Sequence, residues 1–342
     1  MSILYKKQNQ IDNSFSRIFS VLEHDLKKVD EIIIANSSGD AQLIQDISTH
    51  INYAGGKRIR PILTLLSSKI CNYNELEKHN YNLAAAVELI HTATLLHDDV
   101  VDEGELRRGK KTANAIWGNK ASILVGDYLL STAFQLMVKS NSLEVLDLLS
   151  STSRIMSNGE VMQLMSSTDI NIKEETYLQI ISQKTAILFA AATSVGAIIS
   201  NADKEKQKAL YDFGINLGIS FQIMDDILDY SSSNEILGKA IGDDFFESKI
   251  TLPIIIAYNK ANEAEQKRIK KIFGANLMND EKDYALLDEM MVLINKYDTI
   301  SQSIAKSMEY HKKAVENLAI FSDCEEKSML ISIVDYAVSR KK

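Results

Sequence analysis

The sequence predicts an all-α protein built as one large helical bundle. Only two prolines interrupt its 342 residues, and proline is the residue that helix interiors tolerate least. Apolar residues recur at helical spacing along almost the whole chain. No segment alternates apolar and polar residues between hairpin turns, so little or no sheet is expected. Hydrophobic residues make up 45% of the chain, which is enough for a sizeable core.

The periodicity divides the chain into a series of expected helices. They cover residues 13–36, 40–53, 60–72, 79–102, 120–139, 142–167, 173–200, 203–231, 250–260, 263–273, 282–296, 299–320 and 323–340. No Gly/Ser-rich or Pro-rich linker separates them, so we expect residues 1–342 to form a single domain. Its catalytic motifs would lie within 55–250, and the helices of 251–342 would belong to the same body.

Local signals in the first half explain where helices begin and how deeply they lie. Pro61 is favoured at the first position of a helix, so Arg60 would cap the helix that follows. The apolar lead-in Leu95-Leu96 indicates that the helix at 79–102 is buried. This burial matters because charged residues follow it directly.

The second half contains the most apolar helix and the one clear break in periodicity. The run between Lys184 and Asp203 is 18 residues long and uncharged. It contains several hydroxyl and amide side chains, so a buried helix of the bundle is favoured over a membrane span. The segment from Asp229 to Lys249 breaks the periodicity and is expected to be a mobile flap.

The composition excludes several classes of function. A net charge of −8 argues against nucleic acid as a partner. Cys71 and Cys324 fit no metal or redox spacing, which is typical of reduced thiols in a cytoplasmic protein. The N-terminus has no apolar region of a signal peptide, and we expect no stable membrane anchor.

Two aspartate clusters of the same form, DDxxD, are the main chemical signal. On a helix, positions i and i+4 lie about 40° apart around the axis and about 6 Å apart along it, so the first and last aspartates of each cluster share a face. Crowded carboxylates repel one another, and Mg²⁺ relieves this repulsion while it binds the phosphate oxygens of a substrate. The clusters are Asp98, Asp99 and Asp102, and Asp225, Asp226 and Asp229.

One such cluster alone has simpler interpretations. It can be a solvated helix face or a helix end, but the apolar lead-in favours burial, where unpaired carboxylates are costly. It can also be a calcium loop of the EF-hand type counted from Asp99. That interpretation fails because Val101 and Lys110 would occupy ligand positions.

Basic and polar residues accompany both clusters. Arginine suits bidentate contact with phosphate, and Arg107-Arg108 follows the first cluster. Gly55-Gly56 precedes a basic helix start, which is a typical anion site. Each signal alone is at least as typical of solvated surface or, for Gln222, of a polar core residue. The same holds for Lys57, Arg60, Lys184, Thr185, Gln222, Lys239 and Lys249.

Taken in order, these residues resemble the trans-isoprenyl diphosphate synthases, also called polyprenyl synthetases. The matching motifs are GGKRIRP (55–61), LLHDDVVDEGELRRGK (95–110), KT (184–185), FQIMDDILDY (221–230) and GKAIGDD (238–244). The resemblance implies an all-α bundle around a central cavity, of the isoprenoid synthase type. One departure is Ser248, where relatives usually have glycine, and this serine could stiffen the flap.

The resemblance also implies roles for individual residues. Mg²⁺, about two or three ions per site, would be held by Asp98, Asp102 and Asp225. Asp99, Asp226 and Asp229 would bind the ions through water or support the residues that do. Isopentenyl diphosphate would be bound by Lys57, Arg60, His91 and Arg108; without the resemblance, His91 would be interpreted as a packed core histidine. The allylic diphosphate would be contacted by Arg107, Lys184, Thr185, Gln222, Lys239 and Lys249.

The implied reaction is a head-to-tail condensation. Breaking the allylic C–O bond leaves a carbocation and a diphosphate, whose charge metals and cations stabilise. An apolar cavity must exclude water from the cation. No motif side chain suits the role of base, so the released diphosphate is our hypothesis for the proton acceptor.

Product length should depend on the space beneath the first cluster. Ala93 and Thr94 stand where short-chain relatives usually have a bulky aromatic residue, so a growing chain could pass. Fourteen residues of helix give about 21 Å of channel wall. Because no bulky side chain blocks its start, we expect a long product of about C40. Phe134 and Met137 on the neighbouring helix are candidates for a lower stop, although ordinary core packing explains them equally well.

Three alternatives remain beside this interpretation. A non-catalytic subunit of a heteromeric prenyl synthase would typically lack one cluster or the paired arginines. A terpene cyclase would not need a second diphosphate site. A shorter-chain synthase, making geranylgeranyl or farnesyl diphosphate, would differ only in its channel. The resemblance further implies a homodimer. We expect farnesyl diphosphate as starter, with geranyl and geranylgeranyl diphosphate as open alternatives. The product would supply the side chain of a quinone, which could be ubiquinone, menaquinone or another quinone.

Overall fold

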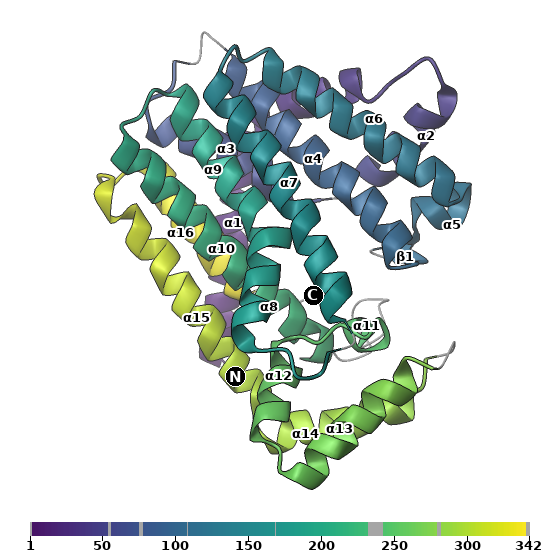
Figure 1. Ribbon diagram of the computed structural model, residues 1–342. Coiled ribbons are helices and arrows are strands. Elements are labelled where there is room, and N and C mark those ends of the chain that lie inside the picture. The colour runs from purple at the N-terminus through teal and green to yellow at the C-terminus, as the bar shows by residue number, and fades with distance from the viewer. Residues whose placement is uncertain are drawn as a thin grey trace.

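A computed structural model (Figure 1) describes residues 2–53, 56–74, 78–107, 109–167, 169–231, 242–278 and 282–339. Side chains are described from residue 15 onward, apart from Tyr53. The predicted Gly55, Arg108 and Lys239 therefore lie outside the described residues.

The first part of the chain forms six helices and a small hairpin. The helices are α1 (Ser2–Asn36), α2 (Gln42–Tyr53), α3 (Ile59–Ile70), α4 (His79–Val101), α5 (Ala113–Trp117) and α6 (Asn119–Val138). The antiparallel strands are β1 (Leu106–Arg107) and β2 (Lys110–Lys111), which pair Leu106 with Lys111 and Arg107 with Lys110.

The second part is also helical. Its α-helices are α7 (Leu143–Ser166), α8 (Glu174–Ile181), α9 (Ile187–Ile199), α10 (Lys204–Ser231), α11 (Asp243–Phe246), α12 (Leu252–Lys260), α13 (Glu263–Asn276), α14 (Tyr284–Lys296), α15 (Thr299–Asn317) and α16 (Glu325–Ser339). A π-helical turn, η1 (Ser182–Ala186), joins α8 to α9, and a 3₁₀ turn, η2 (Leu318–Ile320), follows α15.

Helix α9 lies at the centre of the bundle. All its residues from Ile187 to Ala197 are buried, as expected of a helix that is apolar on every side. It packs against α3, α7 and α10, while α4 lies along α6 (Figure 1). The helices that carry the two aspartate clusters, α4 and α10, thus flank this buried centre.

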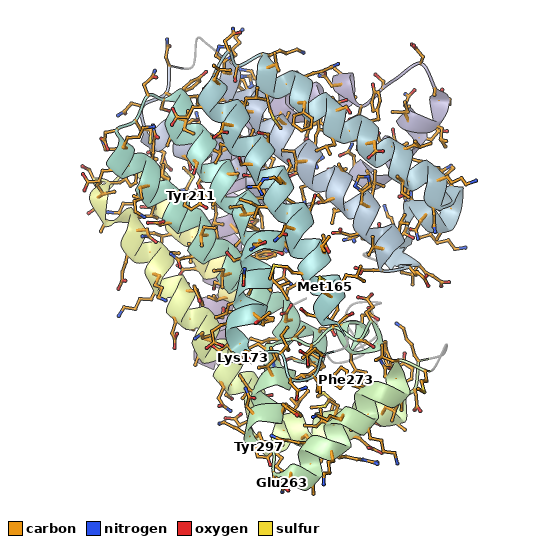
Figure 2. All side chains as sticks on the ribbon, viewed as in Figure 1. Met165, Lys173, Tyr211, Glu263, Phe273 and Tyr297 are labelled. Carbon is orange, nitrogen blue, oxygen red and sulfur yellow. The ribbon has the colours of Figure 1, made fainter. Side chains whose placement is uncertain are left out.

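Two apolar clusters hold the described elements together. The larger one joins α1, α3, α4, α6, α9 and α16, and the smaller one joins α8, α10, α12, α13 and α14. Ile215 of α10 packs against both. Phe273 of α13 is buried in the smaller cluster, and Tyr297 follows α14 at the same end of the molecule (Figure 2). Helix α10 therefore connects the two packing regions.

The prediction of an all-α protein is confirmed. Within the described ranges, the hairpin β1–β2 is the only strand pairing. Two segments are long and apolar enough to span a membrane by length and composition, Asn119–Val138 and Glu174–Ile199, with 44% and 78% of their apolar windows buried. The second contains the uncharged run, and its burial confirms the prediction of a buried bundle helix.

Some local predictions differ from the structure. The helix expected at 173–200 is interrupted by the π-helical turn, and the short helices α5 and α11 were not expected. The predicted cap at Arg60 is wrong. Helix α3 begins at Ile59, and the residue before it is Arg58, with φ 47° and ψ 34°. The Arg58 side chain forms ion pairs with Asp30 (3.2 Å) and Glu88 (2.9 Å).

The expected flap between Asp229 and Lys249 is described only at its ends. Its first residues continue α10, and Asp243–Phe246 form α11; residues 232–241 lie outside the described part. Ser248 has φ 56°, a conformation in which glycine carries no steric cost. Its hydroxyl accepts a hydrogen bond from Asn276 Nδ2 at 3.0 Å, so the serine gains a partner that glycine would lack.

Candidate active site

The first aspartate cluster ends α4. Asp102 is the residue at which the helix stops, and its amide donates to the Asp98 carbonyl at 2.8 Å. Burial raises the pKa of Asp98 to about 7; Lys184 opposes this rise, while Glu160 and Asp102 add to it. In this environment, a nearby cation would stabilise the ionised form of the Asp98 carboxyl.

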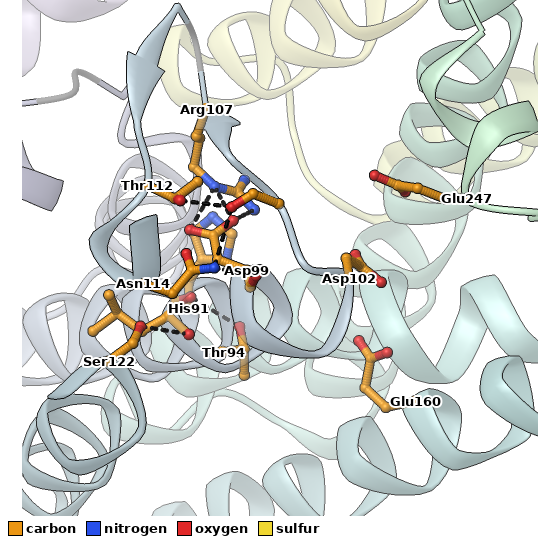
Figure 3. A network of polar contacts seen from close by, with 12 residues as sticks. His91, Thr94, Asp99, Asp102, Arg107, Thr112, Asn114, Ser122, Glu160 and Glu247 are labelled. Carbon is orange, nitrogen blue, oxygen red and sulfur yellow. Dashed lines mark hydrogen bonds and ion pairs between the residues drawn. The ribbon is translucent and has the colours of Figure 1, made fainter. Parts of the chain in front are cut away.

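Asp99 points to a different partner. Its carboxylate accepts two hydrogen bonds from Arg107, from Nη2 at 2.7 Å and Nε at 2.9 Å (Figure 3). Asn114 Nδ2 donates to the Asp99 carbonyl at 3.0 Å and to the Gly104 carbonyl at 3.2 Å, and Thr112 also donates to Gly104. The hairpin is thus fixed to the end of α4, and Arg107 is fixed with it.

Lys184 approaches the first cluster from the π-helical turn. Its Nζ lies 2.8 Å from the carboxylate of Glu160 on α7, and its charge acts on Asp98. Figure 3 places Glu160 and Glu247 on the side of α4 away from the hairpin, beside Asp102. Sequence reasoning assigned no role to either glutamate, because no motif spacing links them to the aspartates.

The second cluster lies on α10, and its middle aspartate is held by donors. Tyr177 of α8 donates to Asp226 Oδ2 at 2.6 Å, and Gln222 donates to Oδ1 at 2.8 Å. Thr185 in turn donates to Gln222 at 2.9 Å. Burial raises the pKa of Asp226 to about 7, against the effect of both donors. The role of Tyr177 was missed because it stands far from Asp226 in sequence.

Asp229 is tied to the segment after the undescribed residues. The amide of Asp244 donates to Asp229 Oδ2 at 3.0 Å, and that of Gly242 donates to the Asp229 carbonyl at 3.0 Å. Burial, followed by the charge of Asp229, raises the pKa of Asp244 well above its ordinary value. Asp244 thereby adds a fourth carboxylate to the second cluster.

Lys249 joins the two clusters. Its Nζ lies 2.9 Å from Asp102 and 2.6 Å from Glu247. Burial alone would lower its pKa, but Glu247, Asp102 and Asp244 together raise it. Because Asp244 contacts Asp229 on α10 while Lys249 reaches Asp102 on α4, this short segment spans from one cluster to the other. The segment from Gly242 to Lys249 therefore links the cluster on α4 to the cluster on α10.

These carboxylates suit a hard divalent cation shared with a phosphorylated ligand. In the described part of the chain, no three His, Cys, Asp or Glu side chains converge on one metal position. Mg²⁺ usually takes one or two carboxylates and completes its shell with water and phosphate oxygens. The raised pKa values of Asp98 and Asp226 are the mark of carboxylates that a cation would relieve.

The residues expected to bind a second diphosphate lie around α3. Arg60 is half-buried, with its guanidinium 4.5 Å from the ring centre of Phe189, and its buried Nε has no hydrogen-bond partner in the protein. Burial lowers its pKa to about 10. Lys57 lies against Tyr336 of α16, 4.6 Å from the ring centre. A guanidinium with an unused, buried donor is suited to an anion.

The remaining predicted residues lie on α4 and α6. His91 is half-buried, and its carbonyl accepts a hydrogen bond from Thr94 at 2.8 Å. Ala93 is buried, Phe134 is partly buried against the larger apolar cluster, and Met137 is inside it. Ala86, Val87 and Ile90 have no exposed surface. An open channel along them would therefore require neighbouring side chains to move apart.

The chain is similar to proteins of known function over nearly its whole length. A family model described as polyprenyl synthetase matches residues 41–290. The octaprenyl diphosphate synthase of Escherichia coli is 37% identical, over 96% of this chain and 100% of that protein. The heptaprenyl diphosphate synthase component 2 of Bacillus subtilis is 36% identical, over 96% and 92%. A crystal structure of polyprenyl synthase from Caulobacter crescentus, complexed with calcium and isoprenyl diphosphate, is 40% identical with a TM-score of 0.90, over 96% and 98%.

Proposed function

The chain belongs to the polyprenyl synthetase family, and from this premise we propose that it is a Mg²⁺-dependent, long-chain trans-polyprenyl diphosphate synthase. The proposed reaction condenses an allylic diphosphate, farnesyl diphosphate as starter, with several isopentenyl diphosphates to octaprenyl diphosphate. The observation that carries the proposal is the pair of aspartate clusters on α4 and α10, spanned by Lys249. We further propose that residues 1–342 act as a single domain, in a cytoplasmic homodimer.

The described residues form two groups, one for each diphosphate. Asp98, Asp102 and Asp225 would hold Mg²⁺, which when bound would neutralise the departing diphosphate. Arg107, Lys184 and Lys249 would orient the same group. Thr185 and Gln222 would support this side of the site, with Asp99, Asp226 and Asp229 holding the surrounding network. Lys57, Arg60 and His91 would bind the second diphosphate, together with Arg108.

A long product is supported by the small residues ahead of the first cluster. Ala93 leaves no bulky side chain beneath Asp98, and α6 with Phe134 and Met137 lies along this part of α4. The name of the E. coli relative favours the same length. We propose that elongation opens a channel between α4 and α6.

A second candidate function is suggested by the B. subtilis relative, whose name describes one component of a heptaprenyl diphosphate synthase. This chain would then need a different subunit to be active. A synthase of shorter products is a further alternative within the same reaction class.

One experiment separates these candidates. Purified protein is incubated with Mg²⁺, farnesyl diphosphate and labelled isopentenyl diphosphate, and the products are resolved by chromatography. The proposal predicts a main product of about C40. A geranylgeranyl product would favour the shorter-chain alternative, and no product from the chain alone would favour a heteromeric enzyme.

A further inference from the structure

The π-helical turn η1 presents successive side chains to the two aspartate clusters. Lys184 pairs with Glu160 and acts on Asp98 at the first cluster. Thr185 begins the hydrogen-bond chain to Gln222 and Asp226 at the second. The conformation of this one turn therefore decides whether both side chains reach their partners at once.

On one side, the turn is in backbone contact with α7. Gly159 is buried in this contact. A Cβ at Gly159 would lie 2.6 Å from the amide nitrogen of Lys184 and 3.0 Å from the carbonyl carbon of Gln183. These are main-chain atoms that cannot rotate away, so any side chain at position 159 would displace the turn itself.

On the other side, the turn is in equally close contact with α10. A Cβ at Gly218 would lie 2.4 Å from Ala186 Cα and 2.7 Å from Ala186 Cβ. Gly218 lies one helical turn before Gln222 on the same helix. The turn is thus enclosed between two helices that approach it without side chains, and one of them carries the residue to which Thr185 bonds.

A π-helical turn is a strained insertion in a helix and persists where its surroundings stabilise it. We propose that Gly159 and Gly218 are positioning residues that fix η1 in its π-helical form. Lys184 and Thr185 then face the two aspartate clusters together. The inference rests on the proposed function, since its main readout is prenyl transfer.

The test uses Gly159→Ala and Gly218→Ala with two matched controls. Gly196→Ala creates an equally severe contact on α9, 2.6 Å from the Ser68 amide nitrogen, but against α3 and away from η1. Gly274→Ala meets no atom within 4 Å. For each protein, kcat, the KM of both substrates and the melting temperature are measured below the melting transition.

Displacement of a catalytic group by a fraction of an ångström costs rate, so Gly159→Ala and Gly218→Ala should lower kcat/KM for the allylic diphosphate by about tenfold to a hundredfold. The KM for isopentenyl diphosphate should change by less than about twofold, since Lys57 and Arg60 lie elsewhere. Gly196→Ala should lower the melting temperature without this kinetic pattern. Values of kcat and KM within about twofold of wild type in both Gly159→Ala and Gly218→Ala would overturn the inference.

A double-mutant cycle separates positioning from a general loss of packing. If Gly159 acts through Lys184 and Thr185, the loss of kcat/KM in Gly159→Ala combined with Lys184→Ala should be smaller than the two separate losses multiplied together. Gly218→Ala with Thr185→Val gives an independent cycle should the first variant fail to fold. In whichever of the two cycles yields folded variants, independent effects of the two substitutions on kcat/KM would contradict the inference.

A readout without catalysis distinguishes this inference from the proposed function. Amide hydrogen exchange of residues 182–187 should be faster in Gly159→Ala than in wild type and unchanged in Gly196→Ala. If the wild-type protein shows no prenyl transfer, the proposed function is overturned, but the inference about η1 is not. Unchanged exchange in Gly159→Ala and Gly218→Ala would overturn the inference about η1.

Discussion

At the scale of single residues, the site contains buried carboxylates that have specific partners, among them Asp99 and Asp226. Asp226 has two donors, and Asp99 has the fork of Arg107. Such groups are costly when a partner is lost, because the remaining charge is left in a medium that solvates it poorly. Three residue-scale predictions follow from this environment and from the size of one side chain.

Tyr177→Phe removes the donor 2.6 Å from Asp226 while it preserves the ring. The loss of a hydrogen bond to a buried carboxylate should lower the free energy of unfolding by about 1–3 kcal/mol. Urea unfolding measures this loss. The control is Tyr258→Phe, which removes a more exposed bond to Asn171 and should cost less than about 1 kcal/mol. Equal effects of the two variants would contradict the role of Tyr177.

The pKa of Asp98, raised to about 7, predicts the pH dependence of the metal-free protein. Between its unfolded pKa and about 7, the folded chain binds more protons at Asp98 than the unfolded chain does. The contribution of Asp98 to stability therefore falls as the pH rises through this window. Asp98→Asn should gain stability relative to wild type from about pH 5 to about pH 8 in the presence of a chelator. A difference that is independent of pH would contradict this environment.

Ala93→Tyr places an aromatic ring below the first cluster. If the hydrocarbon passes this position, the main product should shorten by several isoprene units, as chromatography of the labelled products would reveal. Overpacking should also cost about 1–3 kcal/mol of stability, so the assay is run well below the melting temperature, with Ala93→Ser as the nearly isosteric control. An unchanged product distribution in Ala93→Tyr would exclude the proposed channel.

At the scale of elements, the hairpin β1–β2 and the turn η1 place the basic side chains Arg107 and Lys184 beside the carboxylates. Asn114 fixes the hairpin through the carbonyls of Asp99 and Gly104. Asn114→Ala should raise the KM for the allylic diphosphate by about threefold to tenfold through the freed Arg107. Steady-state kinetics measure this change, with the exposed Asn119 replaced by alanine as control. No difference between the two variants would show that the hairpin does not position Arg107.

The sequence predicted some of the helices and missed others. The apolar periodicity predicted α4, α10 and the buried α9 because burial of a helix face leaves a direct pattern in the sequence. It did not predict the π-helical turn, which depends on glycines from two other helices, Gly159 and Gly218. The predicted cap at Arg60 was wrong because proline is tolerated in the first turn of a helix, so Pro61 does not by itself fix the first residue, and α3 begins at Ile59.

The same distinction applies to the candidate site. The aspartates and cations were found because they stand in short motifs, whereas Glu160, Tyr177 and Asp244 join them only through tertiary contacts. Ser248 is an intermediate case. Its departure from glycine was visible in the sequence, but its positive φ and its bond from Asn276 were not.

At the scale of the whole molecule, one short segment links the two aspartate clusters, since Lys249 pairs with Asp102 on α4 and the amide of Asp244 bonds Asp229 on α10. Mg²⁺ together with pyrophosphate should bind the folded protein and not the unfolded chain. At about a hundred times the dissociation constant, such binding adds about 2.7 kcal/mol to the free energy of unfolding. A thermal melt should therefore shift upward with both ligands present, and much less with pyrophosphate and a chelator. Equal shifts would argue against a metal-bridged site.

The most direct test of the central claim is the rate of labelled isopentenyl incorporation by Asp225→Asn compared with wild type at saturating Mg²⁺. If the two aspartate clusters grip one diphosphate through metal ions, loss of this ligand should lower kcat by about a hundredfold or more while the protein stays folded. A folded Asp225→Asn variant that incorporates label as fast as wild type would contradict the account.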